Sequence, residues 1–430
     1  MIQRSEKLNR QILTVFSMYV GYACFMILKT APIAASSALL DDPSLNLTTT
    51  EWGRILAVGT FGAILGKFIS GWMADNLGGK FTFTLGLFLT AIAIALFAVS
   101  SNVWLLGFTF SLALMAKSAG WPSMAKIIGH WFQPNQYGRV WGIISTSSRV
   151  GTIIATLCLG ALLALLPWRW MLLVAASLGG LVVLFVIWTL KEHPPKSLMD
   201  DDSTEITEVN QTPPHPLDGT TLPQAIRCFL ISRRFWLITG SLMGLTILLD
   251  FLNFIPIYFK ETLEIPSSQS SMMASAFPMG SFLSVLVGGY IFDKLDRAKM
   301  AYLMAALLSV ATGCIWAFYL MPSWGFENGT RIYISIALLL VFGLCVSPCY
   351  YLPMSVFSIE FGGIHSGFLI ALLDALAFSA SMVFSYFGGE LADSQGWGAF
   401  LAVLLAVSIW SVLTTFLFLL GEARVKPSET

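Results

Sequence analysis

The chain has 430 residues, of which 56% are hydrophobic and 11% are charged, and its formal net charge is zero. A soluble domain carries about 25% charged residues, so this chain has too few polar side chains to cover a surface that faces water. The composition excludes a soluble globular protein and predicts a membrane protein. The net charge of zero says little about partners, because what matters is where the charges lie. We expect no nucleic-acid partner.

Twelve apolar stretches are long enough to cross a bilayer, since a spanning helix needs about 20 apolar residues. In chain order the expected spans are roughly 12–36, 51–73, 81–100, 103–126, 139–164, 170–190, 236–258, 270–292, 299–320, 332–355, 366–388 and 398–420. The predicted fold class is therefore an all-α membrane protein, with twelve transmembrane helices in two pseudo-symmetric six-helix bundles.

One long polar segment separates the two sets of six spans. The expected domains are an N-terminal bundle at 1–190, a cytoplasmic linker at 191–234, a C-terminal bundle at 235–420 and a tail at 421–430. The linker is rich in Pro, Asp, Ser and Thr as far as Thr221, which is typical of a flexible segment. Apolar residues then recur at helical spacing from Leu222 to Leu230, beside Arg227. This pattern predicts a short helix on the membrane surface.

The distribution of Lys and Arg predicts the orientation. If the N-terminus is inside, about 16 of these residues fall in cytoplasmic segments. Cytoplasmic loops of membrane proteins carry an excess of Lys and Arg, so this count favours that orientation. Those left outside are Arg54, Arg169, Lys260 and Arg331. We therefore expect a multi-pass protein of the cell (inner or plasma) membrane, with both termini in the cytoplasm.

A short motif occurs at the end of the second span of each half. The first copy runs from Gly71 to Asp75 and closes with Gly78 and Lys80, and the second runs from Gly289 to Asp293 and closes with Arg297. The copies lie about 218 residues apart, half the chain, which indicates a tandem duplication of one membrane unit. A glycine allows two helices to approach closely, and an aspartate beside a basic residue can hold an ion pair. We interpret the motif as a conformational latch.

With these loops after spans 2 and 8, the whole chain resembles the major facilitator superfamily. A narrower resemblance, to the organophosphate:phosphate antiporter family, rests on Gly120-Trp121-Pro122-Ser123, His130-Trp131-Phe132, Tyr137-Gly138, Gly21-Tyr22, Lys67-Phe68 and Pro256-x-Tyr258. The resemblance implies the major facilitator fold, in which two bundles rock about a central site by alternating access. It also implies kinship with carriers of glycerol 3-phosphate and hexose phosphates.

The chain departs from that family at the residues that bind phosphate. The family clamps its substrate with one Arg in the first span and one in the seventh, and these positions correspond here to Lys29 and Leu248. The bidentate geometry that suits a phosphate group is therefore missing. A fifth-span His corresponds to Ser148, and a fourth-span Gln corresponds to Lys117. The expected substrate is accordingly a carboxylate-bearing metabolite or chelator, or an organophosphate.

Cations are expected inside the membrane in the first half. An ionisable residue at the centre of a bilayer costs roughly 2.5–3.5 kcal/mol, so each needs a reason. Arg149 lies beside a polar stripe of Ser145, Ser148, Thr152 and Thr156 and either binds an anionic substrate or forms a salt bridge between two spans. Lys29, with Tyr22 on its helical face, and Lys117 are further expected substrate-binding residues, whereas Lys67 fits a structural role.

The second half contributes carboxylates instead. Asp250 and Asp374 are expected proton-coupling residues, because burial and a nearby cation shift a carboxyl pKa in opposite directions. The alternative for Asp250 is a fixed ion pair with Lys29 or Arg149, and the alternative for Asp374 is contact with the substrate. Asn253, one helical turn from Asp250, is expected to contact substrate. Tyr350 and Tyr351 either stack on substrate or simply pack.

Together these patterns predict a secondary active transporter of a small anionic solute, coupled to protons or to a counter-transported anion. A proton-driven drug or metabolite exporter of the same fold is the alternative, and a non-transporting membrane ligand sensor is an alternative of another class. We expect no catalytic residue, no cofactor and no metal. The remaining expected partner is the lipid bilayer, and the expected oligomeric state is a monomer.

Overall fold

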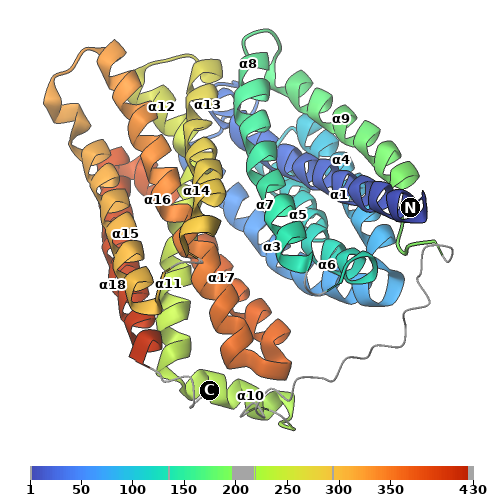
Figure 1. Ribbon diagram of the computed structural model, residues 1–430. Coiled ribbons are helices and arrows are strands. Elements are labelled where there is room, and N and C mark those ends of the chain that lie inside the picture. The colour runs from blue at the N-terminus through green and yellow to red at the C-terminus, as the bar shows by residue number, and fades with distance from the viewer. Residues whose placement is uncertain (1, 134–135, 196–216, 218, 293–294, 425–430) are drawn as a thin grey trace. The chain divides into compact units, whose positions relative to one another are not determined.

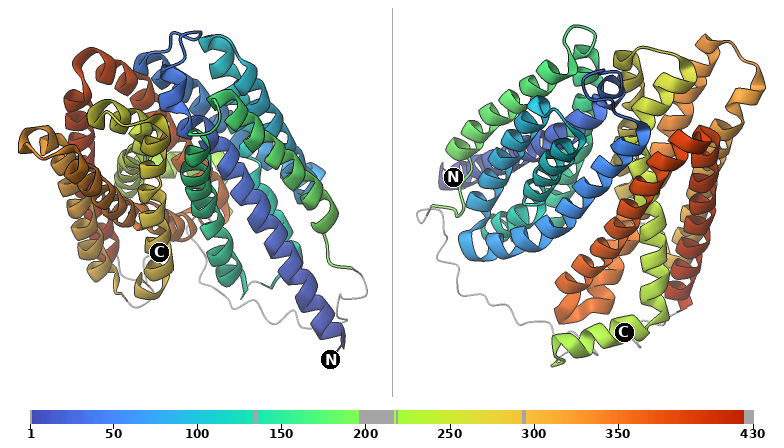
Figure 2. Two further views of the ribbon diagram at one scale, coloured as in Figure 1. Left: turned by 90° about the horizontal axis from the view of Figure 1, so that it is seen from above. Right: turned by 180° about the vertical axis from the view of Figure 1, so that it is seen from behind.

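The computed structural model describes residues 2–133, 136–195, 217, 219–292 and 295–424, and Figures 1 and 2 show their helices from three directions. Side chains at 2–5, 289–292, 351–356, 358–360, 364 and 424 are outside the description. The described residues form helices and connecting loops, without strands. In the described residues, twelve helical segments are long and apolar enough to cross a membrane, and several of them consist of two consecutive helices. The expected all-α membrane protein with twelve spans is confirmed.

The helices of the first half are α1 (Ile2–Ala34), α2 (Ser36–Leu40), α3 (Thr49–Leu77), α4 (Gly79–Val99), α5 (Val103–Lys117), α6 (Gly120–Trp131), α7 (Tyr137–Ile154), α8 (Gly160–Leu162) and α9 (Trp168–Thr189). The helices of the second half are α10 (Leu222–Ile231), α11 (Arg233–Asp250), α12 (Ile255–Leu263), α13 (Ser267–Ala274), α14 (Ala276–Phe292), α15 (Arg297–Leu320), α16 (Asn328–Gly362), α17 (Ser366–Gln395) and α18 (Trp397–Arg424).

Several helix boundaries follow from local sequence. Thr48 and Glu51 form a reciprocal capping box at the start of α3, which satisfies two backbone N–H groups that have no partner inside the helix. Asn102 caps α5 by accepting a hydrogen bond from the backbone N–H of Leu105. Between α3 and α4, Gly78 has φ +93°, a conformation that a residue with a side chain adopts only with strain.

Helices pair in the same way in both halves. In the first half, α1 of the first span packs on α7 of the fifth. Helix α3 of the second span packs on α5 of the fourth, and α4, the third span, packs on α9, the sixth. The second half repeats these pairs as α11 with α17, α14 with α16 and α15 with α18. This correspondence supports the duplication inferred from the repeated motif.

Glycines allow the second and fourth spans of each half to touch. A Cβ added at Gly66 of α3 would collide with the backbone of Met115 in α5. In the second half, a Cβ at Gly280 of α14 would collide with the backbone of Leu340, and one at Gly343 of α16 with that of Phe277. Backbones approach this closely only where both surfaces lack bulky side chains.

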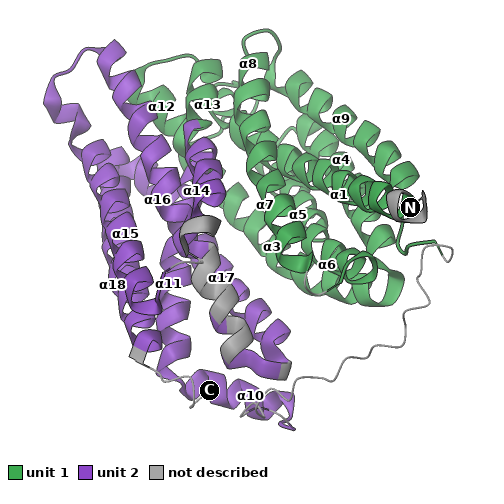
Figure 3. Ribbon diagram, viewed as in Figure 1, with its two compact units in different colours: residues 1–206, 253–275 green, residues 207–252, 276–430 purple. Residues whose placement is uncertain are grey.

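The chain forms two compact units, which Figure 3 colours separately. Unit 1 contains Met1–Ile206 and Asn253–Ser275, and unit 2 contains Thr207–Leu252 and Ala276–Thr430. These units divide the chain at other points than the expected bundles 1–190 and 235–420. The reason is that α12 and α13 pack on α2 and on the end of the fifth span, so the end of the seventh span and the start of the eighth belong to unit 1.

Helix α10 occupies the segment where we predicted a short amphipathic helix. Thr221 and Gln224 form a capping box at its start, with Pro223 in the first turn. Phe229 is fully buried, and its ring lies 5.6 Å from that of Phe361 at the end of α16. The apolar face of α10 therefore packs on unit 2, to which α10 belongs.

Candidate functional site

Tyr22 is the centre of an aromatic and cationic cluster in unit 1. Its side chain is 2% exposed, and its ring meets that of Trp121 edge-on with 5.5 Å between centroids. The Nζ of Lys117 lies 5.9 Å from the centre of the Tyr22 ring, within the range of a cation–π contact. A Cβ at Gly120 would lie 2.6 Å from this ring, so the glycine of the Gly120-Trp121-Pro122-Ser123 motif makes room for the tyrosine.

The cluster continues from α6 onto α7. Trp121 and Trp141 stack with 4.7 Å between centroids and an interplanar angle of 18°. Trp121 remains 39% exposed despite this stacking. The structure thus brings together two predicted substrate-binding residues, Tyr22 and Lys117, and adds two indole rings. The sequence did not mark Trp141, because stacking joins residues 20 positions apart on different helices.

Arg149 lies on α7 and is 6% exposed. Its Nη1 donates hydrogen bonds to the backbone oxygen of Ser145, at 2.8 Å, and to the Oγ of Ser148, at 2.9 Å. Thr152 and Thr156 direct their hydroxyl groups to carbonyl oxygens of their own helix instead. The polar stripe on this span therefore orients one end of the guanidinium group. A π-helical turn follows at Ala155–Leu159, a geometry that is frequent at functional sites.

Lys29 lies on α1, seven residues and hence about two turns beyond Tyr22. Its side chain is half-buried. Among the residues that the structure describes, Lys29 has no hydrogen-bond or ion-pair partner. The first span thus holds an ammonium group whose charge is not balanced by a described neighbour.

In unit 2, helix α17 connects both predicted proton-coupling carboxylates. Ser381 donates a hydrogen bond from its Oγ to the Oδ2 of Asp250, at the end of α11. Tyr350 of α16 donates a hydrogen bond to the Oδ1 of Asp374, at 3.5 Å. Asp374 and Ser381 are seven residues apart on α17 and therefore share a face. The side chain of Tyr351 is outside the described residues.

Asn253 is not on a common α-helical face with Asp250. Helix α11 ends at Asp250, and a 3-10 turn at Phe251–Asn253 follows before α12 begins. The backbone oxygen of Asn253 accepts a hydrogen bond from the indole Nε1 of Trp52 within unit 1. The spacing argument missed this break because it assumed a continuous seventh span, although Pro256 lies in the first turn of α12.

The first copy of the latch motif differs from our expectation at its glycine. Nothing lies within 4 Å of the position that a Cβ of Gly71 would occupy, so this residue does not mark a close helix contact here. The side chain of Asp75 is 78% exposed, and its Oδ1 is 3.9 Å from the Nζ of Lys126 on α6. Lys80 instead donates a hydrogen bond from its Nζ to the backbone oxygen of Ile187, at 3.0 Å.

The second copy of the motif is only partly described. Gly289 lies near the end of α14, Arg297 begins α15 with an exposed side chain, and Asp293 lies outside the described residues.

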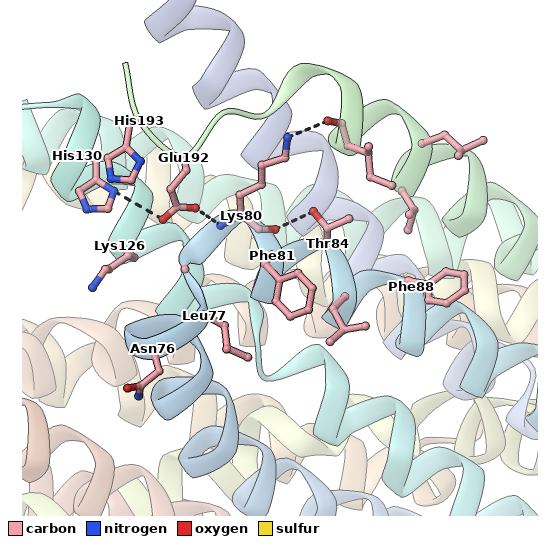
Figure 4. Close-up of a pocket in the computed structure, with 15 residues that line it drawn as sticks. Asn76, Leu77, Lys80, Phe81, Thr84, Phe88, Lys126, His130, Glu192 and His193 are labelled. Carbon is pink, nitrogen blue, oxygen red and sulfur yellow. Dashed lines mark hydrogen bonds and ion pairs between the residues drawn. The ribbon is translucent and has the colours of Figure 1, made fainter. Parts of the chain in front are cut away.

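A residue that the sequence did not mark, Glu192, organises the latch loop in unit 1 (Figure 4). Its carboxylate accepts hydrogen bonds from the backbone N–H groups of Gly79 and Lys80 and thereby caps the start of α4. Its Oε1 also lies 3.7 Å from the Nδ1 of His130. Because Glu192 is more than 110 residues from α4 along the chain, no local pattern predicts this cap.

Comparison with known proteins identifies the family. The major facilitator superfamily model matches residues 12–358. The membrane sensor protein UhpC of Escherichia coli (strain K12) is 22% identical, over 94% of this chain and 91% of its own. A probable hexose phosphate transport protein of Chlamydia pneumoniae is 23% identical, over 92% of this chain and 88% of its own.

Two solved structures share the fold. A bacterial homologue of the human lysosomal transporter Spinster, in an inward-facing and unoccupied conformation, aligns with a TM-score of 0.74 and 15% identity, covering 97% of this chain and 99% of its own. The nucleoside transporter NupG aligns with a TM-score of 0.69 and 14% identity, covering 96% and 100%. These are transporters and not enzymes. Since the family model covers most of the residues, the chain belongs to the major facilitator superfamily.

Proposed function

We propose that this chain is a secondary active transporter that moves a small anionic organic solute by alternating access. The observation that carries the proposal is Lys29, a half-buried ammonium group in the first span with no hydrogen-bond or ion-pair partner among the described residues. A charge at membrane depth is costly, and such residues commonly mark substrate pathways. An anionic substrate would supply the missing counter-charge.

Two further cations of unit 1 support an anionic substrate. Arg149 is held at one end by Ser145 and Ser148, and Lys117 lies over the ring of Tyr22. Two of the three cations, Lys29 and Lys117, present a point charge, unlike the planar fork of Arg. A substrate therefore does not have to be a phosphate group held by a pair of arginines. Hexose phosphates, named for the chlamydial relative, and carboxylate-bearing metabolites are therefore both candidates.

Protons or a counter-transported anion provide the coupling in this proposal. Asp250 and Asp374 are the proton-coupling candidates, and their carboxylates accept hydrogen bonds from the hydroxyl groups of Ser381 and Tyr350 respectively. A change of protonation would alter these hydrogen bonds, because a carboxylate only accepts whereas a carboxylic acid also donates. The excess of Lys and Arg on one side further suggests that both termini are cytoplasmic.

The test is uptake by proteoliposomes that contain the purified full chain. The solutes are glucose 6-phosphate, glycerol 3-phosphate and citrate, each with and without an inward proton gradient or an internal load of the same anion. We expect accumulation of at least one anion, with uptake reduced at least tenfold in Lys29→Gln and Arg149→Gln. Lys299→Gln is the matched control, because Lys299 is 70% exposed beside Asp296 in unit 2.

Three outcomes contradict the proposal. Full uptake of every transported anion by both Lys29→Gln and Arg149→Gln would rule out a substrate site that depends on these two cations. Transport only of neutral or cationic compounds would favour the exporter. A thermal shift with an anion that never accumulates would favour a sensor, the activity named for the Escherichia coli relative.

A further inference from the structure

A groove on unit 1 runs between α4 and α9 (Figure 4), and its lining includes neither Arg149 nor the cluster of Tyr22, Lys117, Trp121 and Trp141. Its volume is about 980 Å³. Large apolar side chains from both spans form its wall, and many are exposed: Phe81 at 53%, Phe88 at 46% and Leu184 at 64%. Because α4 and α9 are both candidate membrane spans, we expect this exposed apolar wall to face hydrocarbon.

One end of the groove is polar and lies at the loop between the second and third spans. Lys80, Lys126, His130, Glu192 and His193 line this end, and Figure 4 shows them around the start of α4. The rings of His130 and His193 stack with 4.2 Å between centroids. The groove is therefore amphipathic along its length, with charges at one end and exposed aliphatic and aromatic side chains at the other.

The charges at the polar end favour an anion. Glu192 directs its carboxylate to the backbone N–H groups that begin α4, so its charge is engaged inside the protein. Lys126 is 35% exposed, and its 3.9 Å distance to the largely exposed Asp75 is long for an ion pair. The Nδ1 of His130 is buried and lies 3.7 Å from the Oε1 of Glu192, so this nitrogen faces the engaged carboxylate and not the open groove. The polar end thus has two lysines and one engaged carboxylate, and since the Nζ of Lys80 is bonded to the backbone oxygen of Ile187, Lys126 is the cation that can meet a ligand.

We propose that this groove binds one anionic phospholipid. From Lys80 to Phe88 the wall on α4 extends about 12 Å at 1.5 Å per residue, enough for the upper part of an acyl chain. The phosphate of the headgroup lies at Lys126 and the stacked histidines, and an acyl chain lies along Phe81, Phe88 and Leu184. A basic pocket between transmembrane helices at the membrane surface has the chemistry that anionic headgroups require.

This site shares Lys80 and Lys126 with the latch loop but contains none of the expected substrate-binding cations Lys29, Lys117 and Arg149, and its test measures lipid retention, not transport. Its failure and the failure of the transport proposal are therefore distinguishable. A soluble phosphate ester could satisfy the polar end alone, but it would leave the apolar wall unused. A second copy of the chain or an apolar peptide could cover the wall, but neither would depend on the charge of Lys126.

The test is native mass spectrometry of the full chain released from detergent with equal amounts of phosphatidylglycerol and phosphatidylcholine of the same acyl chains. We expect phosphatidylglycerol to be retained in preference to phosphatidylcholine. Lys126→Gln should lower this preference about fivefold, since one Lys near an anionic surface is worth about 1 kcal/mol. Lys126→Arg should restore it. Lys299→Gln, the same loss of charge away from the groove, should leave it unchanged.

A second variant tests the apolar wall without changing charge. Leu184→Trp replaces an exposed aliphatic side chain with a bulkier indole ring that fills part of the groove, and it should reduce retention of both lipids. Equal retention of the two lipids by the unaltered chain would overturn the proposal. So would an equal effect of Lys126→Gln and Lys299→Gln. Displacement of phosphatidylglycerol by soluble glycerol phosphate would show a site for free anions, and loss of lipid with formation of dimers would show a protein interface.

Discussion

The indole Nε1 of Trp52 donates a hydrogen bond to the backbone oxygen of Asn253 at 3.0 Å, joining residues 201 positions apart in the chain. Trp52 is fully buried near the start of α3, and Asn253 lies in the 3-10 turn that follows α11. Lys260 of α12 pairs with Asp41 and donates to the backbone oxygen of Ser37 at 3.1 Å. The segment after the break in the seventh span is thus bonded to the first half, within unit 1.

Removing the Trp52 donor should destabilise the protein. Trp52→Phe keeps most of the buried ring but leaves the oxygen of Asn253 without this donor, and an unsatisfied buried polar group costs about 1–3 kcal/mol. Chemical unfolding in mild detergent should show a loss of this size. Trp236→Phe is the control, because Trp236 is 53% exposed and also donates to a backbone oxygen, that of Leu230. Equal losses in both variants would contradict the role given to Trp52.

The ion pair of Arg234 and Glu422 should stabilise unit 2. Nε and Nη2 of Arg234 donate to the two oxygens of Glu422, whose side chain is 8% exposed. Hydrogen bonds to charged groups are worth about 1.5–3 kcal/mol each, and Arg234 is partly exposed, so Glu422→Gln should cost an amount near the lower end of that range.

The exposed pair of Glu6 and Arg10 provides a matched control for Glu422→Gln. Glu6→Gln should cost between about 0 and 1 kcal/mol, because solvent screens such pairs. Thermal unfolding of the purified variants compares the two. A loss for Glu422→Gln no larger than that for Glu6→Gln would refute the prediction.

Asp42, in the loop between the first two spans, should make stability depend on acid pH. A hydrogen bond from the Ser44 hydroxyl, with smaller contributions from the Ser44 N–H, Trp168 and Arg169, lowers the pKa of Asp42 despite partial burial. A carboxyl group whose pKa is lower when folded stabilises the protein above its unfolded pKa, about 3.9. This stability is lost as the pH falls through the lower, folded value.

The measurement for Asp42 is the unfolding temperature from pH 7 to pH 3. Asp42→Asn should unfold at a lower temperature than the unaltered chain at neutral pH, and the difference should shrink as the pH falls below about 3.9. Asp296→Asn is the control, since Asp296 is 76% exposed. A difference for Asp42→Asn that stays constant over this range would exclude the linkage.

Two glycines of α3 should respond in opposite directions to the same substitution. Gly66→Ala places a methyl group against the backbone of Met115 and should cost about 1–3 kcal/mol, as overpacking does. Gly71→Ala meets nothing within 4 Å and should stabilise the helix by about 0.4–1 kcal/mol. Thermal unfolding measures both changes.

Transport measured on Gly71→Ala tests the latch separately. If the glycine is needed in another conformation of the transport cycle, this variant should unfold at a higher temperature and yet transport more slowly. If Gly71→Ala transports at the normal rate, the latch does not need this glycine. It would then depend on Asp75 and its basic neighbour Lys126, which lie 3.9 Å apart here.

The number of spans and their helical type could be predicted because each span has a length and hydropathy that the bilayer imposes, whereas the breaks within spans could not. The capping residues Thr48 and Asn102 act on backbone groups within three residues, so such boundaries are also encoded locally. The repeated motif likewise indicated a duplicated unit, and the equivalent packing of α3 with α5 and of α14 with α16 agrees with it.

The arrangement of the candidate sites depended on contacts between distant residues. The sequence by itself determined a twelve-span membrane protein with a repeated architecture, because hydrophobic length and local spacing are properties of short segments. Only the tertiary structure decided that Glu192 caps α4, that Ser381 bonds to Asp250 and that Gly66 rather than Gly71 marks a close helix contact. Each of these depends on which helix face meets which neighbour, and that choice is made by side-chain packing among all the spans at once.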